Sequence, residues 1–351
     1  QLGMHSAMAG LRMAAPLQAL GQGHSAWSVG LLLALFAAAP VLLALHAGRL
    51  ADRLGYHRPV RIAAGITAVG ALMAVVSTFV DDSAVQFGLL CLAATLTGSG
   101  ANMGMLTVQR TASLTARNNT ERVRVFSWLG IAPAFANVVG PVSVGFMIDG
   151  AGFPAAYAML LAMPMVTLWS ARSVPVAVRS TPAAPPISRT AWDLLAVPGM
   201  KRLLVVNWLL SMCWDVHTFA VPVLGHQREF SATTIGLILG TFTLSVTLVR
   251  LLIPLLAHRL EEARVVHAAM WSTAAVFAVY PLAPSPLLMG VCAALLGLTL
   301  GCVQPMVMST LHQLTPDDRH GEALAFRSMT INTSSTLMPL VFGAAGTLAG
   351  P

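Results

Sequence analysis

Arg12 and Asp215 are the side chains of this sequence best placed to do chemistry, because each lies midway along a long apolar segment, 2–20 and 201–224. An ionised side chain at the centre of a membrane-spanning helix costs about 3 kcal/mol on insertion scales, and such residues usually line a path for a substrate or a proton. Three interpretations follow. Arg12 pairs with Asp215, or Arg12 binds an anionic substrate while Asp215 takes up protons, or each is satisfied by polar neighbours of its own.

The residues next to Asp215 add aromatic and titratable groups. Trp214 and His217 flank it, and we predict that this stretch contacts the substrate. Imidazole titrates near neutral pH, but residues two apart point to different sides of a helix, so Asp215 and His217 do not form an acid–base pair. Polar residues in other apolar segments can line the same path or hydrogen-bond neighbouring helices. They are Asn102, Asn137, Asn207, Gln304 and Asn332.

The sequence lacks the sets of residues that an enzyme needs. An active site requires a nucleophile with its base, or a group of metal ligands, converging at one depth. The chain has no His-x-x-His pair and no glycine-rich phosphate loop. We therefore expect no catalytic residue, no metal site and no cofactor.

Composition assigns the chain to the membrane. Of its 351 residues, 9% are charged and 56% are hydrophobic, whereas a soluble domain carries about 25% charged residues. Its apolar runs have the length of about 20 residues that crosses a bilayer. The net charge of +7 would suggest nucleic-acid binding in a soluble protein. Here the basic residues lie in short loops between the runs, where they orient the chain, so no nucleic-acid partner is expected.

Eleven apolar segments are predicted to cross the membrane as helices. A linker over 174–200, rich in proline, serine and arginine, separates an N-terminal half (1–173) from a C-terminal half (201–351). Six spans precede the linker and five follow it, so we expect that a twelfth helix is missing from this chain. The predicted spans are 2–20, 26–47, 60–79, 85–109, 124–148, 154–173, 201–224, 233–256, 265–283, 286–313 and 323–348.

Basic residues set the predicted orientation. All 20 Lys and Arg residues except Arg12 and Arg228 lie in alternate connections or in the linker, and positive residues mark the cytoplasmic side of a membrane. Asp81, Asp82 and Asp149 then lie on the opposite side. We expect a multi-pass protein of the bacterial cytoplasmic (inner) membrane. Its cytoplasmic connections are 48–61, 110–124, the linker 174–200 with its flanking residues, 250–264 and 319–327.

The two halves of the sequence repeat one another. Residues 16–36 match residues 222–242 at a constant offset of 206, and the identical positions include proline, serine, glycine and phenylalanine. Two six-helix halves related by duplication are typical of secondary transporters, whose substrate site lies between the halves near the middle of the membrane.

A charged loop between the second and third spans reads Gly48-x-Leu50-x-Asp52-Arg53-x-Gly55 and continues to Arg58. It resembles the loop signature of the major facilitator superfamily. The resemblance implies an all-α membrane protein with two six-helix halves around a central cavity, of which this chain holds about 11 of 12 helices.

The resemblance also implies roles for the loop residues. Asp52 is expected to pack against the eleventh span and to hold the cytoplasmic side closed. Gly48 and Gly55 permit a tight turn, and Arg53 and Arg58 can bridge to nearby acids or to lipid phosphates. The alternative is that the loop only fixes the topology.

A second element, Gly140-Pro141-x-x-x-Gly145, lies in the fifth span. It resembles the Gly-Pro element of that family's proton-coupled drug antiporters, which favours efflux in exchange for protons. The fourth span has no arginine in the turns before Gly98, where many proton-coupled members carry one. This absence favours symport, uniport or another coupling ion.

We therefore expect a secondary active transporter that moves a small organic solute by alternating access, as a proton-coupled exporter. A solute importer is the alternative, and a membrane sensor derived from a transporter is a third interpretation. The expected partners are the solute, protons and membrane lipids, and the chain is expected to be a monomer.

Overall fold

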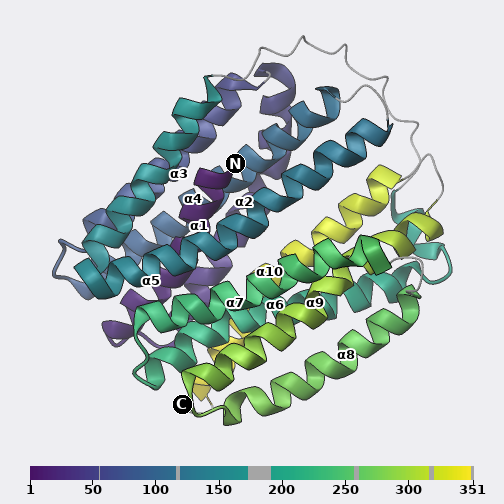
Figure 1. Ribbon diagram of the computed structural model, residues 1–351. Helices are drawn as coiled ribbons and strands as arrows, with labels where there is room; N and C mark the ends of the chain where they lie inside the picture. Colours follow the sequence, from purple (N-terminus) through teal and green to yellow (C-terminus); the bar gives the residue numbers. More distant parts are fainter. Residues whose placement is uncertain (55, 116–118, 173–190, 257–260, 316–319, 349–351) are drawn as a thin grey trace. The chain divides into compact units, whose positions relative to one another are not determined.

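The computed structural model describes residues 1–54, 56–115, 119–172, 191–256, 261–315 and 320–348. These residues form ten α-helices and two short 3-10 helices (Figure 1). The α-helices are α1 (Leu2–Gly21), α2 (Ala26–Leu54), α3 (His57–Ser77), α4 (Ser83–Thr115), α5 (Asn119–Ala171), α6 (Met200–Gln227), α7 (Ala232–Leu256), α8 (Glu262–Val279), α9 (Pro286–Leu314) and α10 (His320–Leu348). The 3-10 helices are η1 (Ala191–Ala196) and η3 (Tyr280–Leu282).

Every predicted span coincides with a helix, which confirms the all-α class. The predicted spans 124–148 and 154–173 both lie in α5, which is interrupted at Gly152 with a φ of 80°. Because glycine adopts positive φ at little cost, α5 consists of two helical segments joined at this residue. By length and apolar composition, seven helices in the described part of the chain can cross a membrane, and a shorter apolar helix covers Ala26–Val41. The number of eleven spans stays a prediction.

The connection between α2 and α3 is shorter than the sequence suggested. Segment 48–61 is expected as a loop, but α2 continues to Leu54 and α3 begins at His57. Leucine, alanine and arginine favour the helix, so α2 extends beyond its apolar part. Gly48, Asp52 and Arg53 consequently lie in the last turns of α2.

The helices form two compact units. Unit 1 contains residues 1–180, 219–240 and 339–351, and unit 2 contains residues 181–218 and 241–338. The last part of α6, the first part of α7 and the last part of α10 therefore belong to unit 1. The division into halves 1–173 and 201–351 stays a prediction.

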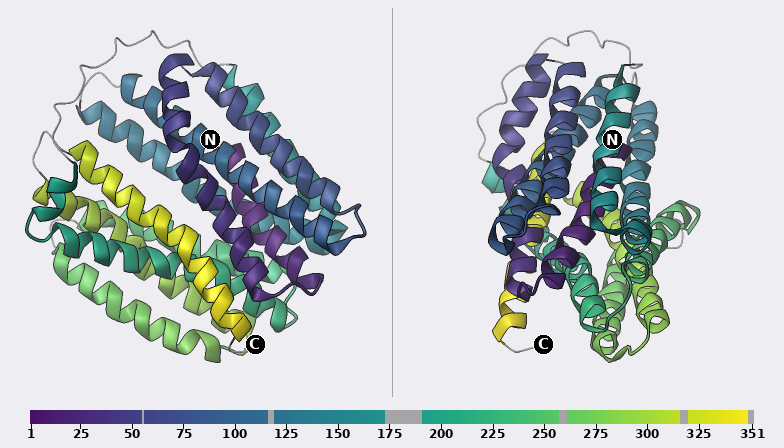
Figure 2. Two further views of the ribbon diagram at one scale, coloured as in Figure 1. Left: turned by 180° about the vertical axis from the view of Figure 1, so that it is seen from behind. Right: turned by 90° about the vertical axis from the view of Figure 1, so that its left-hand side faces the viewer.

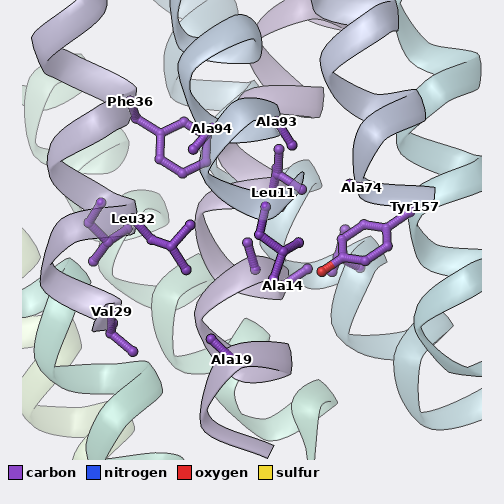
Figure 3. Packing of buried hydrophobic residues seen from close by; sticks show 14 of the residues in the cluster. Leu11, Ala14, Ala19, Val29, Leu32, Phe36, Ala74, Ala93, Ala94 and Tyr157 are labelled. Carbon is purple, nitrogen blue, oxygen red and sulfur yellow. The ribbon is translucent and has the colours of Figure 1, made fainter. Parts of the chain in front are cut away.

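Unit 1 is held together by apolar side chains around α1 (Figure 3). Leu11 and Ala14 of α1 are buried among side chains of α2, α3, α4 and α5. Small residues let helices approach closely within a membrane, and alanine supplies much of this core. Tyr157 of α5 is the largest side chain that the cluster buries completely.

In unit 2, α8 and α9 lie side by side (Figures 1 and 2). Thr273 of α8 donates a hydrogen bond to Thr299 of α9 at 3.2 Å. Elsewhere in the unit, η1 packs with the first turns of α6 and α10 and the last turn of α9. We call these apolar residues the linker-end cluster: Leu194, Met200, Leu204, Leu311, Ala323 and Phe326.

Candidate functional site

Asp215 is buried where α6 meets α10, with 4% of its surface exposed. Ser334 Oγ donates to one carboxylate oxygen at 2.7 Å, and Ser335 Oγ lies 3.0 and 3.2 Å from the two oxygens. A buried carboxylate is costly unless hydrogen bonds compensate it. Because a hydroxyl can both donate and accept, these two serines suit the ionised and the protonated forms of Asp215.

The same face of α6 carries polar side chains toward the start of the helix. Asn207 Nδ2 donates to Thr330 Oγ1 of α10 at 3.1 Å. Ser211 lies between Asn207 and Asp215, four residues from each, and residues four apart share one helix face. We call this line of residues the α6–α10 polar seam: Asn207, Ser211, Asp215, Thr330, Ser334 and Ser335.

Trp214 and His217 face different neighbours from Asp215. The buried His217 ring lies 4.4 Å from Phe242 of α7 and 5.7 Å from Tyr280 of η3, measured between ring centroids. Trp214 lies edge-on to the same Phe242 at 4.6 Å. α6 thus presents Asp215 to α10 and an aromatic group to α7 and η3. Contact of these residues with a substrate stays a prediction.

Arg12 has a comparable environment in unit 1. Its guanidinium carbon lies 6.0 Å from the centroid of the Phe36 ring, which is a distance for cation–π attraction. The repeat offset of 206 relates Phe36 to Phe242, so matched phenylalanine rings contact Arg12 in one unit and His217 in the other. The pairing of Arg12 with Asp215 stays a prediction.

The Gly-Pro element of α5 makes close helix contacts within unit 1. Gly140 faces α1, whereas Pro141 and Gly145 face the first turns of α7. A Cβ atom added at Gly236 would lie 2.5 Å from the Pro141 carbonyl oxygen, and one at Gly145 would lie 2.5 Å from the Ala232 carbonyl oxygen. The two helices therefore meet backbone to backbone, which only glycine allows. We call this contact the α5–α7 seam.

α2 and α10 repeat this contact, also within unit 1. A Cβ atom added at Gly30 would overlap the Pro339 carbonyl oxygen, and one at Gly343 would lie 2.8 Å from the Ala26 carbonyl oxygen. This α2–α10 seam was not predicted from the sequence, although the shared Pro-x-x-x-Gly spacing of α5 and α10, at an offset of 198, could have shown it. The matched pairs are Gly30 with Gly236, Pro339 with Pro141, and Gly343 with Gly145.

The first turns of α7 and α2 are capped at the ends of the two seams. The oxygens of Asp149 accept hydrogen bonds from the backbone N–H groups of Ala232 at 3.0 Å and Thr233 at 2.7 Å. At the matched place, Thr347 Oγ1 accepts from the Trp27 N–H at 3.2 Å. The N–H groups of a first helical turn have no partner within the helix and carry partial positive charge, so oxygen atoms stabilise them.

Among the described residues, the other predicted site residues are not hydrogen-bonded to these groups. In the described part of the chain, no hydrogen bond holds the half-buried side chains of Asn102, Asn137 and Gln304. Arg58 is exposed in the first turn of α3. The surroundings of Gly48, the side chains of Asp52 and Arg53, and the whole of Gly55 are not described by the structure, so the role of the loop motif stays a prediction.

Long apolar helices, a buried carboxylate and backbone-to-backbone seams are together features of a multi-pass membrane transporter. Comparison with protein families supports this class directly. The family model for the Major Facilitator Superfamily matches residues 2–201 and 203–351. The chain belongs to this family of transporters, and it is therefore a transport protein and not an enzyme.

The curated relatives of the chain include exporters. It is 23% identical over 346 residues to the enterobactin exporter EntS of Shigella flexneri, covering 97% of this chain and 82% of the relative. The EntS protein of Citrobacter koseri is 23% identical over 350 residues with the same coverage, 97% and 82%.

Solved structures of transporters share the fold. A mutant of the nucleoside transporter NupG aligns with a TM-score of 0.72 at 15% identity, covering 98% of this chain and 90% of that chain. A bacterial homologue of the iron transporter ferroportin, in its inward-facing state, has a TM-score of 0.72 at 15% identity, with coverage of 97% and 89%. A D-xylose-proton symporter has a TM-score of 0.72 at 14% identity, with coverage of 97% and 88%. These likenesses concern the fold alone.

Proposed function

We propose that this protein exports a small organic solute across the bacterial inner membrane in exchange for protons, and that Asp215 binds the coupling proton. The observation that carries the proposal is the buried carboxylate of Asp215 with two hydroxyl partners that suit both of its protonation states. Relatives named as enterobactin exporters support the outward direction. Enterobactin is accordingly the first solute to test.

Alternating access needs one closed end at a time, and the two glycine seams supply a closed end within unit 1. In the proposed orientation, the part of α5 that contains Asp149 faces away from the cytoplasm. The α5–α7 and α2–α10 seams then close the route to the outside, and their separation releases the solute there. Residues 48–58, at the end of α2 and the start of α3, close the cytoplasmic side in turn, through Asp52.

Arg12 has one of two alternative roles under this proposal. It binds an anionic group of the solute, or it pairs with Asp215 when the proton has left. Replacement by glutamine separates the two roles. Loss of solute binding at all pH values indicates the first role, and a change confined to the pH dependence of transport indicates the second.

The decisive experiment measures proton movement in proteoliposomes that contain the full-length protein under an imposed pH gradient, with enterobactin and a panel of small organic solutes. We expect proton influx that depends on the exported solute. In Asp215→Asn, proton movement is lost while solute exchange without a gradient continues. In Asp52→Asn, turnover is slower and solute affinity is unchanged.

Other outcomes of this experiment identify the alternatives. Solute and protons that move in the same direction identify an importer, and solute flux without proton movement identifies a uniporter or another coupling ion. Unchanged pH dependence in Asp215→Asn would remove Asp215 from the mechanism. Absence of any flux across the panel would favour the sensor.

A further inference from the structure

We propose that the α6–α10 polar seam is the route by which the proton moves between Asp215 and the end of unit 2 where α6 and α10 begin. This inference rests on the proposed function, which makes Asp215 the proton-binding group. The seam places Asn207 and Ser211 in line with Asp215, at four-residue steps along one face of α6. In the proposed orientation, the route leads to the cytoplasm, where an exporter of this kind releases its proton.

The spacing of the seam matches the reach of single water molecules. Residues four apart are separated by about 6 Å along a helix axis, since the rise is about 1.5 Å per residue. One water molecule with two hydrogen bonds of about 2.8 Å spans that distance. Single water molecules can therefore bridge Asn207 to Ser211 and Ser211 to Asp215 by hydrogen bonds.

The seam also has unused hydrogen-bonding capacity. Among the described residues nothing donates to Asn207 Oδ1, and Ser211 Oγ has no hydrogen-bond partner. These two residues are only 0% and 8% exposed. A buried polar group without a partner costs about 1–3 kcal/mol. Two such groups in adjacent turns, on the face that leads to Asp215, indicate that this face bonds to water when the proton moves.

The linker-end cluster closes the route at its outer end. Leu204 lies one turn before Asn207 on α6, and Phe326 lies one turn before Thr330 on α10; both belong to the cluster. Trp192 of η1, the helix that also carries Leu194, contacts Phe326 with a distance of 5.2 Å between the two ring centroids. A hydrophobic constriction excludes water until it widens. Proton transfer along the seam therefore requires that this cluster loosens.

Asp215 is the acid that the seam serves. The sequences of α6, α7 and α10 contain one further acid, Glu322, in the first turn of α10. His217 is turned to Phe242 and Tyr280. The other charged or titratable residues on the unit 2 parts of these helices are Lys201, Arg202, Cys213, Arg250, His320 and Arg327.

The test follows the Asp215 carboxyl group by time-resolved infrared spectroscopy after a pH jump, on the purified full-length protein. The carboxylic acid band is assigned by its loss in Asp215→Asn. We expect Asn207→Leu and Ser211→Ala to slow the appearance of this band about tenfold, because each removes a hydrogen-bonding group of the route. Thr273→Val is the matched control. It removes a buried hydroxyl between α8 and α9, and the rate should not change.

The outcomes separate this inference from the proposed function. Wild-type rates in both seam variants would overturn the route, even if solute-linked proton flux persists. Slowed rates in the seam variants, with no solute-linked proton flux in the wild type, would support the route and overturn proton-coupled export. Absence of a titrating Asp215 band would overturn both. Ser211→Ala, the smaller change, decides the matter if Asn207→Leu does not fold.

Discussion

The α5–α7 and α2–α10 seams are two copies of one contact that differ at their ends. Both keep glycines that meet a proline carbonyl of the partner helix, Gly236 on Pro141 and Gly30 on Pro339. The caps differ, because Asp149 offers a carboxylate that accepts two backbone hydrogen bonds, whereas Thr347 offers a hydroxyl that accepts one.

The comparison shows which part of the contact geometry fixes and which part chemistry can vary. Helix backbones approach this closely only without a side chain, so both copies keep glycine. The cap lies at a helix end, where any oxygen acceptor fits. A carboxylate there gains about 0.3–1 kcal/mol from the helix dipole that a hydroxyl does not. We therefore expect the α5–α7 seam to be the stronger one.

The largest effect on the closure of the seams is expected from two variants of equal strength. Gly236→Ala should weaken the α5–α7 seam, and Gly30→Ala should weaken the α2–α10 seam. The added methyl group meets backbone atoms that cannot rotate away, and overpacking of this kind costs about 1–3 kcal/mol. Spin labels are attached at Asp81→Cys and Gln227→Cys, exposed residues of unit 1, in a variant without the four native cysteines. Separation of the seams is measured as a longer distance between the two labels.

Gly88→Ala is the control for these variants. It also lies within a helix, but a Cβ atom there would have no neighbour within 4 Å. The label distance should stay as in the wild type. If all three variants have the same distance distribution, the seams are not close contacts that hold this end shut.

The next largest effect is expected from Asp149→Ala. Loss of a helix cap costs about 1–2 kcal/mol, so the population with separated labels should increase about tenfold. Asp149→Asn keeps one acceptor and removes the charge, and it should lie between the wild type and Asp149→Ala. An equal effect of the two variants would mean that the charge contributes nothing to the cap.

The smallest effect is expected from Thr347→Val, which removes one hydrogen bond and keeps the shape of the side chain. The cost is about 0.5–1.5 kcal/mol, the usual net value of a single hydrogen bond. The same label pair measures it, and Thr347→Ser should restore the wild-type distance. A larger effect for Thr347→Val than for Asp149→Ala would reverse the proposed order of the seams.

The sequence predicted the helices and singled out Asp215 because both depend on local information, namely apolar run length and a charge within it. It did not predict Ser334 and Ser335 as partners of Asp215, since hydroxyl residues are common in membrane helices and only the packing of α6 on α10 selects these two. The loop between α2 and α3 was overestimated because charge marks the membrane boundary and not the end of a helix.

The glycine seams have a consequence for the wetting of this end of the protein. When a leucine-packed contact separates, each side chain that becomes hydrated costs about 1.5–3 kcal/mol. When the Gly30 and Gly236 contacts separate, water meets helix backbone whose hydrogen bonds are already made within the helix. At these two glycines the surface that becomes hydrated is mainly backbone. If the seams open in the transport cycle as we propose, this end can therefore become hydrated and close again at low energetic cost.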